Sequence, residues 1–272
     1  MRNIKLTIEY DGTAYHGWQS QVNAAAIQDV VGAAVNRLIG EACTLYGSSR
    51  TDAGVHAYGQ VANFRTASGV PADKFAFALN TLLPRDIAIV KSEEVNPDFH
   101  ARFSARGKKY RYLYYNSVFP SALLRNRAWH VYYPLDGDAM REASRHLLGT
   151  HDFLAFSASG SSVKTTVRTL SSIAIREDLQ GDGCVKRLCP EAEDLPPAGI
   201  PGQGTCSRVL ALEVEGDGFL YNMVRIIAGT LAEVGYGRIK PDAVPDILES
   251  RDRKRTGLTA PPQGLYLMEV RY

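Results

Sequence analysis

Hydrophobic and polar residues alternate near the start of the chain, where Ile4, Leu6 and Ile8 fall on one side. A period of two residues is typical of a strand with one buried face, so residues 4–10 are predicted to form a β-strand. Between residues 24 and 39 the apolar positions follow helical spacing, which predicts an amphipathic helix. The same reasoning predicts helices at 72–82, 138–148 and 219–234, and strands at 59–65, 86–90, 108–116, 167–175, 209–216 and 264–271.

The order of these elements favours an α+β fold over a parallel doubly wound one, because two stretches of similar strand and helix order follow each other. We expect two similar α/β halves, residues 1–105 and 106–272, that share a largely antiparallel central sheet flanked by helices. Residues 181–207 are rich in glycine, proline and charge and lack periodicity. They are predicted to be a long surface loop that joins two strands of a hairpin.

Composition places few limits on function. The chain has 272 residues, 45% of them hydrophobic and 22% charged, with a net charge of +2. No apolar run approaches the roughly 20 residues that span a bilayer, and the first residues lack the pattern of a secretory signal. We therefore expect a cytoplasmic protein that does not bind a membrane. Four cysteines are few for this length, which favours a reduced interior over a disulfide framework.

Asp52 lies in the polar segment Gly47–Ala57, between two glycines that permit tight backbone geometry. Arg50 lies two residues away and would favour the carboxylate form of Asp52. A plain interpretation is a solvated turn in which Asp52 caps a backbone amide. Asp52 and His56 would share one face of a helix and could bind a metal, but Gly54 weakens a helix here and no further ligand follows.

Three cysteines in the long loop, Cys184, Cys189 and Cys206, raise a zinc hypothesis. Because a structural zinc site needs four ligands and no fourth is evident, free thiols are the simpler interpretation. We expect no metal and no cofactor.

Basic residues form two clusters. The first surrounds Tyr110 and suits phosphate contact combined with base stacking; it comprises Arg102, Arg106, Lys108, Lys109 and Arg111. The second comprises Arg251, Arg253, Lys254 and Arg255. A run of charge is commonly just a solvated face, and this alternative stays open for both clusters.

The segment GSSRTDAGVHA at residues 47–57 is similar to the GRTDAGVHA signature of the TruA family of pseudouridine synthases, with Ser49 in place of the usual glycine. Further matching elements follow in the family's order along the chain. They are YDGT at 10–13, GWQ at 17–19, DFHARFS at 98–104, KYRY at 109–112, HDF at 151–153, FLYNMVR at 219–225 and GLYL at 264–267. The resemblance thus spans nearly the whole sequence.

This resemblance implies the pseudouridine synthase fold, with both halves forming one catalytic unit and Asp52 as the nucleophile. It implies that Tyr110 stacks on the uracil, that Arg225 pairs with Asp52, and that Leu265 lines the pocket. Taken alone, Tyr110 would be read as a core residue and Arg225 as a side chain reaching toward solvent. The family further implies a homodimer that binds tRNA and modifies positions 38, 39 and 40 of the anticodon stem-loop.

Alternatives remain at this point. The chemistry could be directed at another RNA, or the chain could be an inactive RNA-binding protein on the same scaffold. A metal-dependent nuclease is a third option, weakened by the lack of a carboxylate cluster. Whether Asp52 adds to the sugar C1′ or first removes a proton to give a glycal is also open.

Overall fold

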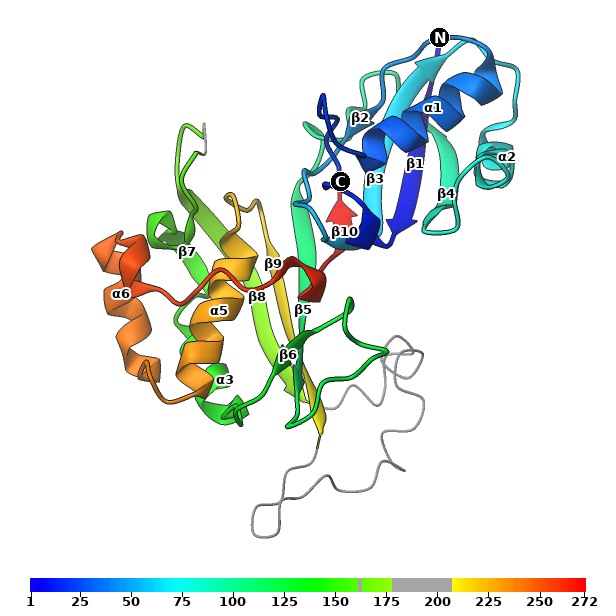
Figure 1. Ribbon diagram of the computed structural model, residues 1–272. Coiled ribbons are helices and arrows are strands. Elements are labelled where there is room, and N and C mark those ends of the chain that lie inside the picture. The colour runs from blue at the N-terminus through cyan, green and yellow to red at the C-terminus, as the bar shows by residue number, and fades with distance from the viewer. Residues whose placement is uncertain (161–162, 178–206) are drawn as a thin grey trace. The chain divides into compact units, whose positions relative to one another are not determined.

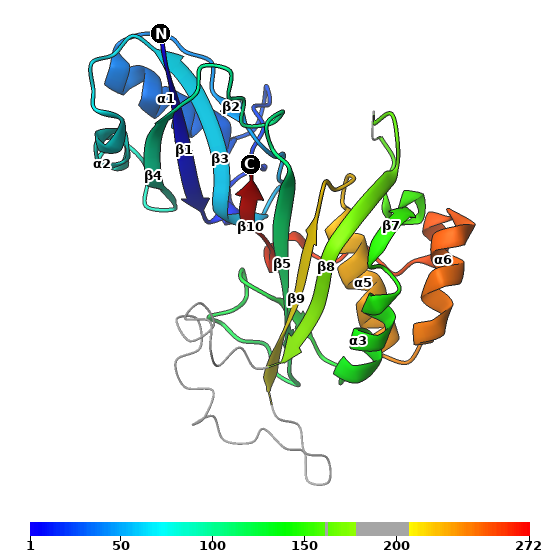
Figure 2. The ribbon, with the colours of Figure 1, turned by 180° about the vertical axis from the view of Figure 1, so that it is seen from behind.

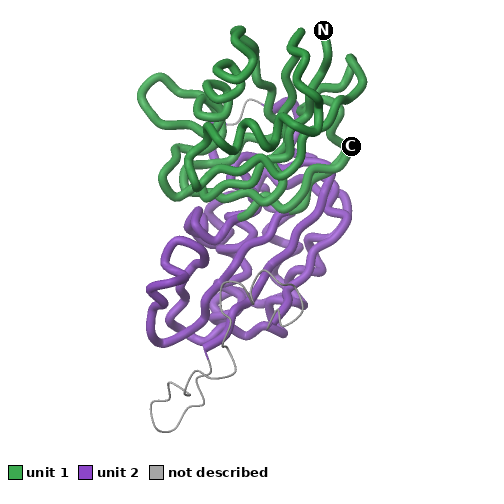
Figure 3. The backbone as a smooth tube through the Cα atoms, turned by 90° about the vertical axis from the view of Figure 1, so that its right-hand side faces the viewer, with its two compact units in different colours: residues 1–109, 266–272 green, residues 110–265 purple. Residues whose placement is uncertain are grey.

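The computed structural model describes residues 1–160, 163–177 and 207–272. The chain divides into two compact units (Figure 3). Unit 1 comprises Met1–Lys109 and Tyr266–Tyr272, and unit 2 comprises Tyr110–Leu265. The C-terminal strand therefore returns to the unit in which the chain begins. Among the described residues, none of the helices is long and apolar enough to cross a membrane.

Unit 1 is a sheet covered on one face by two helices (Figure 1). Its strands are β1 (Arg2–Tyr10), β2 (Tyr46–Gly47), β3 (His56–Thr66), β4 (Ile87–Val95) and β10 (Leu265–Arg271), and its helices are α1 (Ile27–Ile39) and α2 (Phe75–Asn80). Strand β1 lies between β3 and β4 and is antiparallel to both, whereas β10 runs parallel to β3. The predicted alternation in β1 is confirmed, since Ile4, Leu6 and Ile8 are fully buried.

Unit 2 has a sheet of order β5-β9-β8-β7, with β6 parallel to β5. Its strands are β5 (Gly107–Asn116), which begins in unit 1, β6 (Trp129–Val131), β7 (Gly149–Asp152), β8 (Val167–Glu177) and β9 (Arg208–Gly216). Its helices are α3 (Gly137–Arg145), α5 (Met223–Gly235) and α6 (Val244–Ser250). Helices α3 and α5 lie over one face of the sheet, and Figure 2 shows the described strands from the other side.

Short 3-10 turns connect these elements, at Gly12–Ala14, Ala72–Lys74, Leu154–Phe156, Pro241–Ala243, Arg253–Arg255 and Pro262–Gly264. The fold is thus α+β, with mixed strand pairing and flanking helices. The likeness of the two halves stays a prediction.

Two helix predictions are corrected. The helix expected at 219–234 begins only at Met223, because Asn222 has a left-handed backbone with φ 60° and the Met223 amide closes a turn onto the Leu220 carbonyl. The helix expected at 72–82 is a 3-10 turn followed by the short α2. Strands β8 and β9 pair antiparallel as predicted. Apart from Ser207, the predicted loop between them lies outside the described residues, as do its three cysteines.

Candidate active site

Asp52 lies on a tight turn between β2 and β3 of unit 1. Its carbonyl oxygen accepts a hydrogen bond of 3.1 Å from the Val55 amide, and Gly54 has φ 76° at the bend. Thr51 is buried beside it, whereas Asp52 itself is half-buried. The predicted presentation of Asp52 on a turn, outside any helix or strand, is confirmed. Residues 52–56 are not helical, so the arrangement assumed by the metal hypothesis is absent.

Buried hydrogen bonds hold the residues before Asp52 in place. Gln60 on β3 is fully buried; its Nε2 donates to the Ser49 carbonyl at 2.8 Å, and its Oε1 accepts from Ser48 Oγ at 2.7 Å. The hydroxyls of Tyr10 and Thr51 lie 2.8 Å apart in the interior. Side chains of two strands thus fix the turn, which limits the positions that the Asp52 backbone can take. Sequence reasoning missed Gln60, although an amide within an apolar strand is a signal of such a role.

The segment around Gly12 and Gly17 packs directly on the Asp52 turn. The Trp18 amide donates to the Thr51 carbonyl at 3.2 Å. A Cβ atom at Gly12 would overlap the carbonyl oxygen of Val55, and one at Gly17 would overlap that of Thr51. The close approach of these two backbones requires glycine at both positions. The early YDGT and GWQ elements are therefore a support for the Asp52 turn.

His56 also contacts the segment that supports the Asp52 turn. It is 2% exposed, and its Nδ1 lies 3.1 Å from the Gly12 amide nitrogen and 3.2 Å from Asp11 Oδ1. Its ring stacks on Tyr266, with 4.8 Å between the centroids. The hydrogen bond to His56 is the main reason that the pKa of Asp11 lies far below its usual value. His56 thus joins β3, β10 and the 3-10 turn of the YDGT element.

Tyr110, Arg225 and Leu265 all belong to unit 2. Tyr110 on β5 is 7% exposed and makes an edge contact with Phe219 at 4.9 Å between centroids. Leu265, at the start of β10, is also 7% exposed. Both side chains are therefore buried. Burial fits packing in the core as well as a place in the wall of a pocket, so it does not distinguish these two roles.

Arg225 lies in the first turn of α5 and does not extend freely into solvent. Its Nε donates to the Ala260 carbonyl at 2.7 Å, and its Nη1 donates to Asn222 Oδ1 at 2.9 Å. The unusual backbone of Asn222 places its side chain where the guanidinium can reach it. These bonds hold the guanidinium in one orientation. Its pairing with Asp52, which belongs to unit 1, stays a prediction.

The first basic cluster divides by burial. Arg102 and Arg106 are exposed, and Lys108 and Lys109 are half-buried; Arg50, outside this cluster, is also exposed. Burial, followed by the charge of Arg102, lowers the pKa of Lys108 to about 8. The exposed arginines Arg102 and Arg106 suit contact with phosphate groups.

Arg111 differs from the rest of the cluster. It is 7% exposed, and its Nε donates to Oε1 of the buried Glu213 at 3.0 Å. This buried pair ties β5 to β9, which favours a structural role over RNA contact. Arg111 is therefore not among the residues proposed to bind RNA.

The second basic cluster is largely engaged within the protein. Arg251 forms an ion pair of 2.9 Å with Asp152, and Arg253 donates to Thr256 and Gly257.

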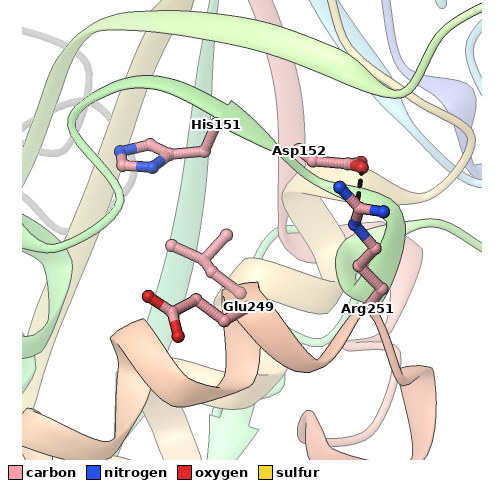
Figure 4. A pocket seen from close by; sticks show the side chains of 5 residues that line it. His151, Asp152, Glu249 and Arg251 are labelled. Carbon is pink, nitrogen blue, oxygen red and sulfur yellow. Dashed lines mark ion pairs between the residues drawn. The ribbon is translucent and has the colours of Figure 1, made fainter.

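Arg251 and Asp152 line an open pocket of about 330 Å³ together with His151, Leu248 and Glu249 (Figure 4). Asp152 also accepts hydrogen bonds from Leu154 and Thr166, so the HDF element serves mainly to connect chain segments. No group of three potential metal-binding side chains is found in the described parts of the chain.

An α+β chain that presents one carboxylate on a hydrogen-bonded, glycine-supported turn and also carries exposed cations has the features of an RNA-modifying enzyme. The profile of a family described as tRNA pseudouridine synthase matches residues 6–104 and 143–272. Proteins named tRNA pseudouridine synthase A from Acetivibrio thermocellus, Thermoanaerobacter pseudethanolicus and Geotalea uraniireducens are 54%, 47% and 47% identical to it over 272 residues, covering 100% of both chains. The chain therefore belongs to the tRNA pseudouridine synthase family, and the resemblance seen in its motifs is confirmed. As a member it is an isomerase that acts on uridine in tRNA.

Proposed function

We propose that this enzyme converts uridine to pseudouridine at positions 38, 39 and 40 of the tRNA anticodon stem-loop, with Asp52 as the nucleophile. The observation that carries the proposal is the rigid turn that holds Asp52 half-buried beside Thr51. A nucleophile must meet the sugar at a defined distance and angle, and preorganised geometry of this kind lowers the barrier to reaction.

The reaction breaks the N1–C1′ bond of the target nucleotide and joins C1′ to C5 of the same base. The nucleotide must first leave its stack and enter the active site. The carboxylate of Asp52 then adds to C1′ or removes a proton from the sugar to give a glycal. The detached uracil turns until C5 faces C1′. As the C5–C1′ bond forms, the Asp52–C1′ bond breaks in the first route, and the sugar regains its proton in the second. C5 then loses its proton, and N1, freed from C1′, takes one up. Atoms balance without an oxidant or reductant, and we propose no cofactor.

The unit 2 residues have complementary roles in this proposal. Tyr110 stacks on the uracil while it turns, and Leu265 provides an apolar wall. Arg225 fixes the rotamer of Asp52, because a guanidinium can pair with a carboxylate through two parallel hydrogen bonds. The two contacts that orient Arg225, to Ala260 and Asn222, support this role. In unit 1, Arg50 is proposed to take part in substrate binding.

The partners belong to the proposal as well. Exposed Arg102 and Arg106 and half-buried Lys108 and Lys109 are proposed to bind tRNA phosphates. The homodimer rests on the family resemblance, and the cytoplasmic location expected from the sequence stays a prediction. Size-exclusion chromatography coupled to light scattering measures the molar mass in solution and so tests the dimer directly.

The Asp52→Asn variant tests the nucleophile, because the amide keeps the shape of the side chain and removes its charge. We expect it to fold and bind tRNA normally but to release no tritium from tRNA labelled at uridine C5. Asp73→Asn is a matched control, since Asp73 is an exposed carboxylate in the same unit. Appreciable turnover by Asp52→Asn would refute the assignment. Mapping pseudouridine in the treated tRNA tests the three positions.

A further inference from the structure

An exposed group of aromatic rings in unit 1 joins Tyr46, on β2, to a loop near residue 100. The rings of Tyr46 and His100 lie 4.9 Å apart between centroids, and those of His100 and Phe103 lie 4.4 Å apart. Phe103 is 77% exposed and Tyr46 is 42% exposed. We call these three residues the Phe103 platform. The ring planes are tilted by 46° and 39°. Large exposed rings that already contact one another offer an apolar surface without a partner in the described structure.

The loop that carries the platform is held by buried hydrogen bonds. Asn63 on β3 is 2% exposed; its Oδ1 accepts from the Ala101 amide at 2.8 Å, and its Nδ2 donates to Asn3 at 2.9 Å. Asn3, 1% exposed, donates to the Phe99 carbonyl at 2.9 Å. The Tyr272 hydroxyl donates to the Ala101 carbonyl at 2.8 Å. This network fixes the backbone on which His100 and Phe103 stand.

The rings are fixed within the loop too. The His100 Nδ1 accepts from the Arg102 amide at 3.1 Å, and the Ser104 hydroxyl accepts from the His100 amide at 3.0 Å. The guanidinium of Arg102 lies over the Phe103 ring, 5.6 Å from its centroid. Contacts that already hold His100 and the loop backbone reduce the entropy that is lost when a ligand stacks on the platform.

Positive charge adjoins the platform. Arg102 is exposed and Lys108 is half-buried, and in the described part of the chain neither forms an ion pair. The two charges influence each other, since Arg102 contributes to the low pKa of Lys108. An anion placed beside both would relieve this repulsion. Exposed rings next to uncompensated cations are the pattern by which proteins bind unpaired nucleotides: rings stack on bases and cations contact phosphates.

We propose that the Phe103 platform stacks on one unpaired base of the tRNA, other than the target uridine, while Arg102 and Lys108 bind the adjoining phosphates. This inference rests on the proposed function, because it takes tRNA as the ligand. It assigns to Phe103, His100 and Tyr46 a part in substrate binding that is separate from the chemistry at Asp52. The sequence signal for it is a phenylalanine that follows an arginine directly in a segment of polar and basic residues.

The test compares substitutions at Phe103 with one at Phe77. Phe77 is a matched control because it is 71% exposed in the same unit and has Lys74 over its ring at 5.4 Å, but belongs to no ring stack. Dissociation constants are measured with an unmodified tRNA transcript, and kcat and KM by tritium release. Phe103→Ala and Phe103→Leu are expected to raise Kd and KM about tenfold, a change of about 1.4 kcal/mol, with little change in kcat. Phe103→Trp should bind like the wild type.

Unchanged tRNA binding by Phe103→Ala would overturn the proposal, as would an equal loss in Phe77→Ala. Wild-type binding by Phe103→Leu would do the same, because leucine offers apolar contact without a stacking face. Arg102→Gln adds an independent measurement: the slope of log Kd against log salt should fall by about one. An unchanged slope would remove Arg102 from the phosphate contact. Failure of the proposed function would give a different result from failure of this proposal. The wild type would then release no tritium from tRNA, whatever the binding data show.

Discussion

Gly17→Ala tests the idea that the GWQ element supports the Asp52 turn. Gly17 has φ 89°, and a Cβ atom there would overlap the carbonyl oxygen of Thr51, next to Asp52, the proposed nucleophile. Because that oxygen belongs to the backbone, it can move away only if the turn moves with it. Gly40 provides the control: its φ is 71°, and no heavy atom lies within 4 Å of a Cβ placed on it. Gly40→Ala therefore introduces the backbone strain without the overlap.

The expected magnitudes follow from these two terms. A left-handed backbone costs a residue with a Cβ about 1 to 2 kcal/mol, and the lower entropy of the unfolded chain offsets part of this. We expect Gly40→Ala to lower the free energy of unfolding by about 1 kcal/mol. The forced movement adds about 1 to 3 kcal/mol in Gly17→Ala, for a total of about 2 to 4 kcal/mol. Displacing a catalytic group by about 1 Å costs on the order of 100-fold in rate, which we expect in the kcat of Gly17→Ala alone.

Urea unfolding followed by circular dichroism measures the first effect for both variants. Tritium release, measured where each variant is fully folded, measures the second. Equal kcat values for folded Gly17→Ala and Gly40→Ala would refute the reasoning, because the overlap would then leave the position of Asp52 unchanged.

Two further predictions concern charge. Arg225→Ala should lower kcat by at least about 100-fold per folded enzyme, because it removes the proposed partner of the nucleophile, and Arg225→Lys should restore part of it; if Arg225→Ala lowers only the melting temperature, Arg225 is a packing residue. Lys108, with a pKa of about 8, is charged below that pH and neutral above it. Wild-type tRNA affinity at constant salt should therefore fall more between pH 7 and pH 9 than that of Lys108→Arg, whose charge persists; equal pH dependence of Kd would exclude Lys108 from phosphate contact.

Much of the fold follows from local pattern. Strand β1 shows its buried face directly as alternation, and α1 shows it as helical spacing, because each has one face toward the core and one toward solvent. The start of α5 could not be read in this way. The residues before Met223 are apolar enough to continue a helix, and only the left-handed backbone of Asn222, held within the tertiary structure, sets the boundary.

The first basic cluster shows that local pattern also fails to separate exposed from buried residues in the candidate site. Arg102 and Arg111 look alike as arginines near an aromatic residue, yet Arg102 is exposed and Arg111 is buried against Glu213. Residues 110–114 are all buried, so this part of β5 has lost the alternation that would distinguish an inner from an outer side. Glu213 lies about a hundred residues away, on β9.

The family and the presence of Asp52 on a glycine-bounded turn could be predicted from sequence, because motif order and turn chemistry are local properties of the chain. The residues that support that turn become apparent only in the folded protein. Gln60 and Gly17 act through contacts with residues distant in sequence, and hydrophobic pattern carries no record of which distant groups will meet. The exposure of Phe103 was decided in the same way, since the loop that presents it is held by Asn63 from another strand.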